Sequence, residues 1–270
     1  MKGKVYLVGA GPGDPELLTV RALRLLQSAD VVLYDDLVSP EVLSLIPSTA
    51  ELHAVGKRCG SKSIGQEEIN FLMVALAETG RHVIRLKSGD PLIFGRAGEE
   101  IEALRNAGIA GEIVPGITSV LGAAAAAQIP LTHRRASSAV VLLTGQQASG
   151  SKAAEWEKLV SSGSTLVIYM PGKNYAEISS KLRAAGLENG TPCALISRAT
   201  TPRQRVHRTS IGELGDAPHL ASPTLLVIGE VVRWADSAVL DSPSASVWPS
   251  EMGVVSDGVA AGLGDEEARA

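Results

Sequence analysis

Short apolar runs alternate with longer amphipathic segments along the first half of the chain. The apolar runs predict buried strands at Lys4–Val8, Asp30–Tyr34, Glu51–Val55, His82–Leu86 and Glu112–Val114. The segments between them predict helices at Pro15–Gln27, Pro40–Leu45, Gln66–Glu78 and Gly98–Asn106. Alternation of strands and helices at these lengths predicts an α/β fold with a mainly parallel sheet and helices on both of its faces.

A second series of strands follows an alanine-rich helix that ends near Pro130. It comprises predicted strands at Ala139–Thr144, Thr165–Met170, Pro192–Ser197 and Thr224–Val232, and helices near Glu155–Val160 and Ala176–Ala185. Because the strand spacing differs from that of the first half, we expect a second α/β domain, and the directions of its strands stay open. The predicted organisation is an N-terminal domain at 1–133, a C-terminal domain at 134–235 and a disordered acidic tail at 236–270.

Composition and charge narrow the class of protein. Apolar residues make up 45% of the chain and charged residues 20%, as in soluble globular proteins. The segment 236–270 holds seven acids against one base, a net −6, so the formal charge of −4 leaves +2 for residues 1–235. A slightly basic body suits a small anionic ligand, whereas nucleic acid usually requires a strongly basic face. We therefore expect no nucleic-acid partner.

No membrane segment, disulfide or metal site is evident in the sequence. The longest apolar stretch, Ile117 to Ala127, is well short of the ~20 residues that span a bilayer, and the first apolar run is too short for a signal peptide. Cys59 and Cys193 are far apart, and the five histidines lack the spacing of metal ligands. The prediction is a soluble cytoplasmic protein that holds no metal and binds no membrane.

The stretch from His82 to Glu100 is the strongest candidate for a ligand site. It begins as a buried strand, turns at Ser88–Pro91 and continues as a helix. In open α/β sheets such turns lie at the carboxyl ends of the strands, where ligands bind. The bases Lys87 and Arg96 flank the turn and suit an anionic ligand.

A glycine-rich turn, Gly9 to Asp14, follows the first strand. It is not a dinucleotide-binding fingerprint, because Asp14 stands where the third glycine belongs and Pro12 removes one N–H from the loop. One interpretation is structural, with Asp14 capping the helix that begins at Pro15. A ligand-binding role stays equally open.

Acidic and basic side chains follow two further strands. Asp35, after the second strand, is either a cap for the helix at Pro40 or a functional group, which would act as a general base or orient a ring N–H of the ligand. Lys57 and Arg58, after the third strand, are either solvated or bind carboxylates. From Lys57 to Arg96 there are seven bases and four acids, which is a modest bias toward an anionic substrate.

The entrance and exit of the alanine-rich helix are also candidates. Small residues at Pro115–Ser119 let a backbone or a flat ligand approach closely, and Thr118 or Ser119 is expected to cap the helix. Arg134 belongs to a basic turn at the predicted domain junction. None of these features alone identifies a function.

Together, these segments resemble the S-adenosyl-L-methionine-dependent tetrapyrrole methyltransferases, most closely the members that methylate uroporphyrinogen III. The resemblance covers the chain from about Lys4 to Val232. It rests on ten motifs in order: GAGPGDPELLT, YDDLVSPEVL, VGKR, QEEIN, VIRLKSGDPLIFGRAGEE, VPGITS, IPLTHR, LLTGQ, VIYMPG and TPRQRV. The order of the motifs makes the likeness specific, since each one alone is weak.

The resemblance implies a site between two α/β domains, and a homodimer without the fused dehydrogenase–chelatase module of some relatives. It implies that Asp35 is the proton acceptor and Lys57 the proton donor. The implied S-adenosyl-L-methionine contacts are Pro12, Ser88, Gly89, Asp90, Ile93, Thr118, Ser119, Met170 and Ala199. We add a hypothesis for the substrate carboxylates, which assigns them to Arg58, Lys87, Arg96 and Arg134.

The chemistry of the implied reaction agrees with the residues that the resemblance assigns to the site. Methyl transfer from a sulfonium is an in-line displacement by an activated donor, so the protein mainly aligns the reactants and excludes water. Methylating C2 and then C7 of uroporphyrinogen III, through precorrin-1 to precorrin-2, leaves rings that must lose or shift a proton. The alternatives are a methyltransferase for a later precorrin and a non-catalytic tetrapyrrole-binding protein.

Overall fold

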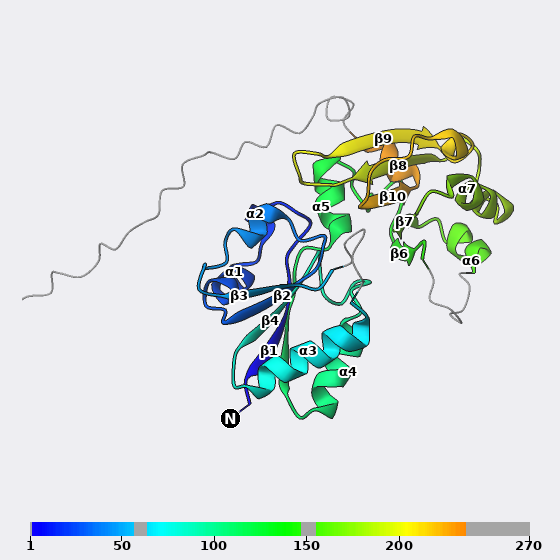
Figure 1. The fold of residues 1–270 in the computed structure, drawn as a ribbon. Helices are drawn as coiled ribbons and strands as arrows, with labels where there is room; N and C mark the ends of the chain where they lie inside the picture. Colours follow the sequence, from blue (N-terminus) through cyan, green and yellow to red (C-terminus); the bar gives the residue numbers. More distant parts are fainter. Residues whose placement is uncertain (1, 57–63, 147–154, 236–270) are drawn as a thin grey trace, which may run out of the picture.

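The computed structural model describes residues 2–56, 64–146 and 155–235, which form two α/β domains, each built on a five-stranded sheet (Figure 1). The predicted site residues Lys57 and Arg58, and the predicted tail at 236–270, lie outside the described residues. No helix in the described ranges is long and apolar enough to cross a membrane.

The first sheet is entirely parallel, which confirms the prediction. Its strand order is β3-β2-β4-β1-β5, with β1 Lys4–Gly9, β2 Val31–Tyr34, β3 Glu51–Ala54, β4 Val83–Lys87 and β5 Ala110–Val114. Apolar residues of α3 (Gln66–Glu78) and α4 (Ala97–Asn106) pack on one face. Those of α1 (Val20–Gln27) and α2 (Pro40–Leu43) pack on the other (Figure 1). Helices on both faces leave β4 buried along its whole length.

The single helix predicted at Pro15–Gln27 is wrong. The structure has a short 3-10 turn, η1 (Pro15–Leu17), before α1. The break has a local cause, because Leu18 and Thr19 are extended and the Thr19 hydroxyl accepts a hydrogen bond from the Ala22 amide. A second N-cap within the segment therefore starts a second helix.

The second sheet mixes parallel and antiparallel strands, which settles the question that the sequence left open. The order is β6-β7-β10-β8-β9, with β6 Val140–Thr144, β7 Thr165–Tyr169, β8 Pro192–Ser197, β9 Arg205–Ser210 and β10 Thr224–Ile228. Only β6 and β7 pair in parallel, and β10 runs antiparallel to both of its neighbours. The helical segments around this sheet are α6 Trp156–Ser161, α7 Tyr175–Ala184 and η2 Leu214–Asp216.

Two features of this sheet differ from the prediction. The strand expected at Thr224–Val232 ends at Ile228, because Gly229 takes a left-handed φ of 135° and the 3-10 helix η3 (Glu230–Trp234) follows. Strand β9 was not predicted. Its sequence, RVHRTS, is mostly polar because it lies at the edge of the sheet and is half-buried.

Helix α5 (Ser119–Ala126) connects the two sheets (Figure 1). Its buried residues Val120 and Ala123 belong to a core that includes Val167 of β7 and Val227 of β10. The helix thus starts beside the first sheet and packs against the second. The boundary near residue 133 stays a prediction.

Candidate active site

The backbones of three loops touch at the carboxyl ends of β1, β4 and β5. A Cβ atom added to Gly116 would lie 2.3 Å from the Gly89 oxygen and 2.8 Å from the Gly9 Cα. Gly11 and Gly89 also exchange backbone hydrogen bonds of 3.2 and 2.8 Å. Because β1 lies between β4 and β5, the sheet order brings the two glycine-rich turns of the sequence together.

The Asp90 carboxylate holds this arrangement through the main chain. Its Oδ1 accepts a hydrogen bond from the Leu92 amide at 2.9 Å, and its Oδ2 accepts one from the Gly116 amide at 3.0 Å. The first bond shapes the turn after β4, and the second ties that turn to the loop that enters α5. Asp90 therefore fixes the turn after β4 against the loop that enters α5.

At the S-adenosyl-L-methionine site that the resemblance implies, replacing Asp90 by Ala is expected to weaken the binding of this donor about 10-fold, because two charge-assisted hydrogen bonds that fix the loops are lost. Calorimetric titration measures the affinity. Asp216→Ala, at an exposed position of η2 in the second domain, is the control and should bind normally. Unchanged affinity in Asp90→Ala would rule out this function of Asp90.

The cap of α5 differs from the prediction. Thr118 stands at the N-cap, but its hydroxyl bonds to the Tyr169 hydroxyl at 2.7 Å and caps no amide. The Val120 amide donates to the same Tyr169 oxygen at 3.2 Å. Burial raises the pKa of Tyr169, so its hydroxyl stays protonated and can serve both partners. A side chain from the end of β7 thus caps the helix that leads out of the first domain.

The structure places several of the predicted cofactor residues near these loops. Gly89 faces Ser119, since an added Cβ would lie 3.3 Å from its hydroxyl. Ile93 packs against the buried cluster that contains Ala199. Met170 follows Tyr169, is 40% exposed and has a left-handed φ of 49°. These contacts bring both domains to one region.

The glycine-rich turn after β1 has both a local and a long-range role. Asp14 accepts from the Glu16 amide at 2.9 Å, which confirms the predicted cap. The Asp14 amide also donates to the Thr200 hydroxyl at 3.2 Å, next to Ala199. Pro12 packs closely against α5, where a Cβ on Gly122 would lie 2.6 Å from its ring.

Asp35 does not cap the helix at Pro40, because the Ser39 hydroxyl accepts the bond from the Val42 amide. The Asp35 side chain is half-buried at the end of β2, and its carboxylate pairs with the guanidinium of Arg85. A general-base role is the interpretation that this placement leaves open.

Lys87 was predicted to bind the substrate, but its side chain is buried and cannot reach it. Its side chain is 4% exposed, and Nζ lies 3.0 Å from Oε1 of the fully buried Glu100. Burial and the neighbouring Arg85 guanidinium lower the pKa of Lys87. The side chain points into the core beneath α4, because the alternation of β4 continues to its last residue.

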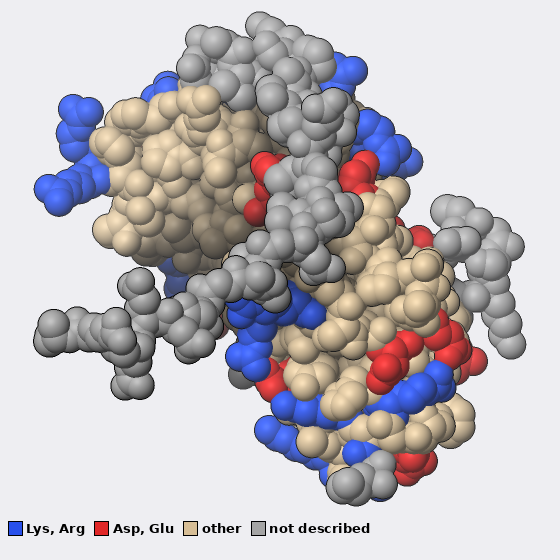
Figure 2. Space-filling view, turned by 90° about the vertical axis from the view of Figure 1, so that its left-hand side faces the viewer, with Lys and Arg blue, Asp and Glu red and all other residues tan. Residues whose placement is uncertain are grey.

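Arg96 and Arg134 are exposed, as a contact with substrate requires. Arg96 makes two 2.7 Å hydrogen bonds to the carboxylate of Glu99. Such exposed pairs contribute only ~0–1 kcal/mol, so a substrate carboxylate can compete for the guanidinium. Arg134 follows His133, whose ring stacks on Trp234 at 4.1 Å. On the face shown in Figure 2, Lys and Arg side chains in the lower part form a row next to Asp and Glu side chains, and other Lys and Arg side chains stand apart at the upper left.

Sequence reasoning missed two residues, Arg85 and Tyr169. A charged residue in the middle of a strand that is predicted to be buried was an available signal for Arg85. No local pattern marks Tyr169, whose partners lie about 50 residues away. In the three described ranges, no group of three or more His, Cys, Asp or Glu side chains is arranged for a metal ion.

Comparison with known proteins identifies the family. The sequence model of the Tetrapyrrole (Corrin/Porphyrin) Methylases matches residues 4–215. The chain belongs to the tetrapyrrole methylases. A uroporphyrinogen-III C-methyltransferase of Pseudomonas aeruginosa is 54% identical over 236 residues, which cover 86% of this chain and 96% of that protein. A siroheme synthase of Azotobacter vinelandii is 51% identical over 237 residues. The chain spans about half the length of the siroheme synthases that it matches.

Solved structures of other tetrapyrrole methylases share both domains. Uroporphyrin-III C-methyltransferase from Thermus thermophilus, complexed with S-adenyl homocysteine, matches with a TM-score of 0.75 and 40% identity, over 86% of this chain and 99% of that one. A cobalt precorrin-4 methyltransferase matches with a TM-score of 0.77 and 32% identity, over 85% of this chain and 95% of that one.

Proposed function

We propose that this protein transfers methyl groups from S-adenosyl-L-methionine to C2 and C7 of uroporphyrinogen III. The products are precorrin-2 and S-adenosyl homocysteine, and precorrin-1 is the intermediate. The observation that carries the proposal is the contact of the Gly9, Gly89 and Gly116 loops beside the start of α5, in a chain with the family's motifs. Precorrin-2 would feed siroheme or cobalamin synthesis.

The residues at these loops suit the methyl donor. A Cβ atom added to Gly89 would lie 3.3 Å from the Ser119 hydroxyl and 3.8 Å from the Thr118 Cα, and Ile93 packs against the apolar cluster that contains Ala199. A ligand with a charged amino-acid end and a flat heterocycle needs both kinds of surface. The bound donor supplies an activated methyl group. The residues proposed to hold it are Pro12, Ser88, Gly89, Asp90, Ile93, Thr118, Ser119, Met170 and Ala199.

The proton transfers are assigned to two residues. We propose that Asp35 accepts the proton from the methylated ring and that Lys57 donates one. Uroporphyrinogen III carries eight carboxylates, and we propose Arg58, Arg96 and Arg134 as their contacts. We also propose that the protein is a cytoplasmic homodimer and uses no metal.

An anaerobic assay of the full chain with uroporphyrinogen III and S-adenosyl-L-methionine tests the proposal, with methyl groups counted by mass spectrometry. We expect two added methyl groups per substrate. Binding of S-adenosyl homocysteine without methylation would favour a methyltransferase for a later precorrin. Absence of donor binding would favour a non-catalytic tetrapyrrole-binding protein.

A further inference from the structure

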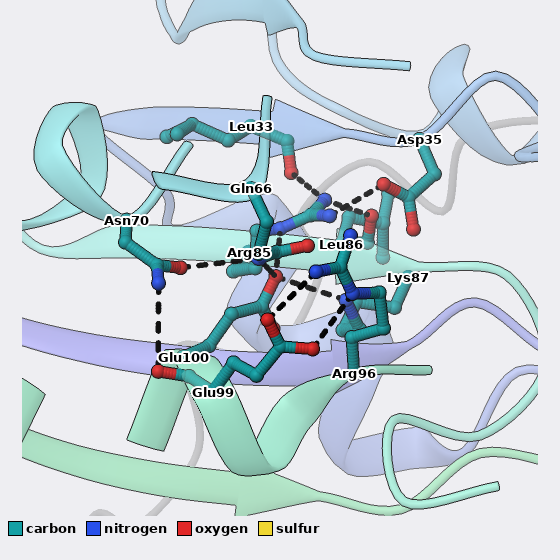
Figure 3. A network of polar contacts seen from close by, with 10 residues as sticks. All are labelled: Leu33, Asp35, Gln66, Asn70, Arg85, Leu86, Lys87, Arg96, Glu99 and Glu100. Carbon is teal, nitrogen blue, oxygen red and sulfur yellow. Dashed lines mark hydrogen bonds and ion pairs between the residues drawn. The ribbon is translucent and has the colours of Figure 1, made fainter. Parts of the chain in front are cut away.

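Four charged side chains form a network that runs from the core of the first domain to Asp35 (Figure 3). We call Arg85, Lys87, Glu100 and Asp35 the charge network. Arg85 and Lys87 come from β4, and Glu100 comes from α4. Glu100 Oε1 accepts from Arg85 Nε at 2.9 Å and from Lys87 Nζ at 3.0 Å, and Arg85 Nη2 donates to Asp35. The exposed fraction of the side chain is 0–4% for the first three and 29% for Asp35.

Stability alone does not account for this network. Removing three charges from water is costly, and well-packed apolar residues of similar volume are often at least as stable as a buried ion pair. Glu100 Oε2 is buried without a hydrogen-bond partner in the described part of the chain, which adds to the cost. Asp35 is the member of the network whose side chain reaches solvent. An effect of the network on function would therefore act through Asp35.

The contacts of Arg85 leave its guanidinium little freedom. Nε is held by Glu100, and Nη1 faces the carbonyl oxygens of Leu33 at 3.4 Å and Leu86 at 3.2 Å. The remaining arm, Nη2, is directed at Asp35. Because a guanidinium does not lose its proton in proteins, the network cannot pass a proton from Asp35 to Glu100. It can fix the direction of the Asp35 carboxylate.

We propose that Arg85, held by Glu100, is the positioning residue for Asp35. The proposal rests on the proton-acceptor role given to Asp35 under the proposed function. The fixed N–H of Arg85 occupies Oδ1 of the carboxylate, which leaves Oδ2 for the substrate. Without Arg85, Asp35 samples other rotamers and meets the reacting ring less often.

A double-mutant cycle tests the proposal on the full-length protein, with Asp35→Asn, Arg85→Met and the double variant. Asp35→Asn is expected to lower kcat about 100-fold or more. Arg85→Met should lower kcat about 10- to 100-fold, with the affinity for S-adenosyl homocysteine changed less than about 2-fold. The double variant should be no slower than Asp35→Asn alone, because Arg85 acts through Asp35.

Arg85→Lys is the variant that keeps the buried charge. Its single ammonium pairs with Glu100 but lacks the planar fork that also reaches Asp35, so we expect the same loss of kcat as in Arg85→Met. This variant decides the question if Arg85→Met does not fold. Full kcat in Arg85→Lys, or multiplied losses in the double variant, would overturn the positioning role. Full kcat in Asp35→Asn would instead overturn the proton-acceptor role in the proposed function.

Discussion

Glu100→Gln is expected to lower the free energy of unfolding by about 3–5 kcal/mol, more than any surface change in the same helix. Glutamine has nearly the same shape, so packing is kept while the only anion among the three buried charges is lost. Arg85 keeps its ion pair with Asp35, but Lys87 loses the carboxylate that it contacts and stays close to the Arg85 guanidinium. An unpaired buried charge is strongly destabilising. In a protein of this size the loss corresponds to a decrease in Tm of roughly 6–20 °C.

The neighbouring residue Glu99 provides a matched control. Glu99→Gln removes the same charge from the same turn of α4, but its side chain is 51% exposed and pairs with the exposed Arg96. Its expected cost is at most ~1 kcal/mol. Thermal unfolding followed by circular dichroism compares the two variants. Equal losses would mean that the charge network contributes nothing to the stability of the first domain.

Gly116→Ala is expected to weaken the binding of S-adenosyl homocysteine by roughly 100-fold. The added methyl group would lie 2.3 Å from the Gly89 oxygen and 2.8 Å from the Gly9 Cα, so main chain, not a flexible side chain, has to move. Overpacking of this kind costs about 1–3 kcal/mol, and every ~1.4 kcal/mol is tenfold in affinity. The turn at Gly89 and the loop that follows Gly116 contain residues proposed to hold the donor.

Gly98→Ala is the control for this variant. Gly98 lies in the first turn of α4, and an added Cβ would meet no atom within 4 Å. Alanine is the better helix former by up to ~1 kcal/mol, so this variant should bind normally and unfold at the same or a higher temperature. Calorimetric titration of both variants gives the comparison. Normal affinity in Gly116→Ala would show that the loop contact is dispensable for donor binding.

The repeating pattern of the chain was sufficient for most of the fold. The helix Gln66–Glu78 and the strand Pro192–Ser197 have the predicted bounds, because periodicity and flanking turn residues are local properties. The motifs were also sufficient to identify the family, because their order is a property of the sequence itself. The prediction of the site was less complete, because sequence patterns report only on residues that are close together in the chain. Asp14 is a cap as predicted, but its bond to Thr200 spans 186 residues and leaves no trace in the spacing.

What the sequence by itself determined is therefore most of the helices and strands, the parallel first sheet and the family. Only the tertiary structure decided which polar side chains face the ligand loops and which face the core. Lys87 follows the predicted strand as a candidate surface base, yet it is buried on Glu100 because α4 covers that face of β4. Tyr169 caps α5 because the second sheet carries its hydroxyl there. Such contacts depend on how elements distant in sequence pack, and this information is absent from any local window.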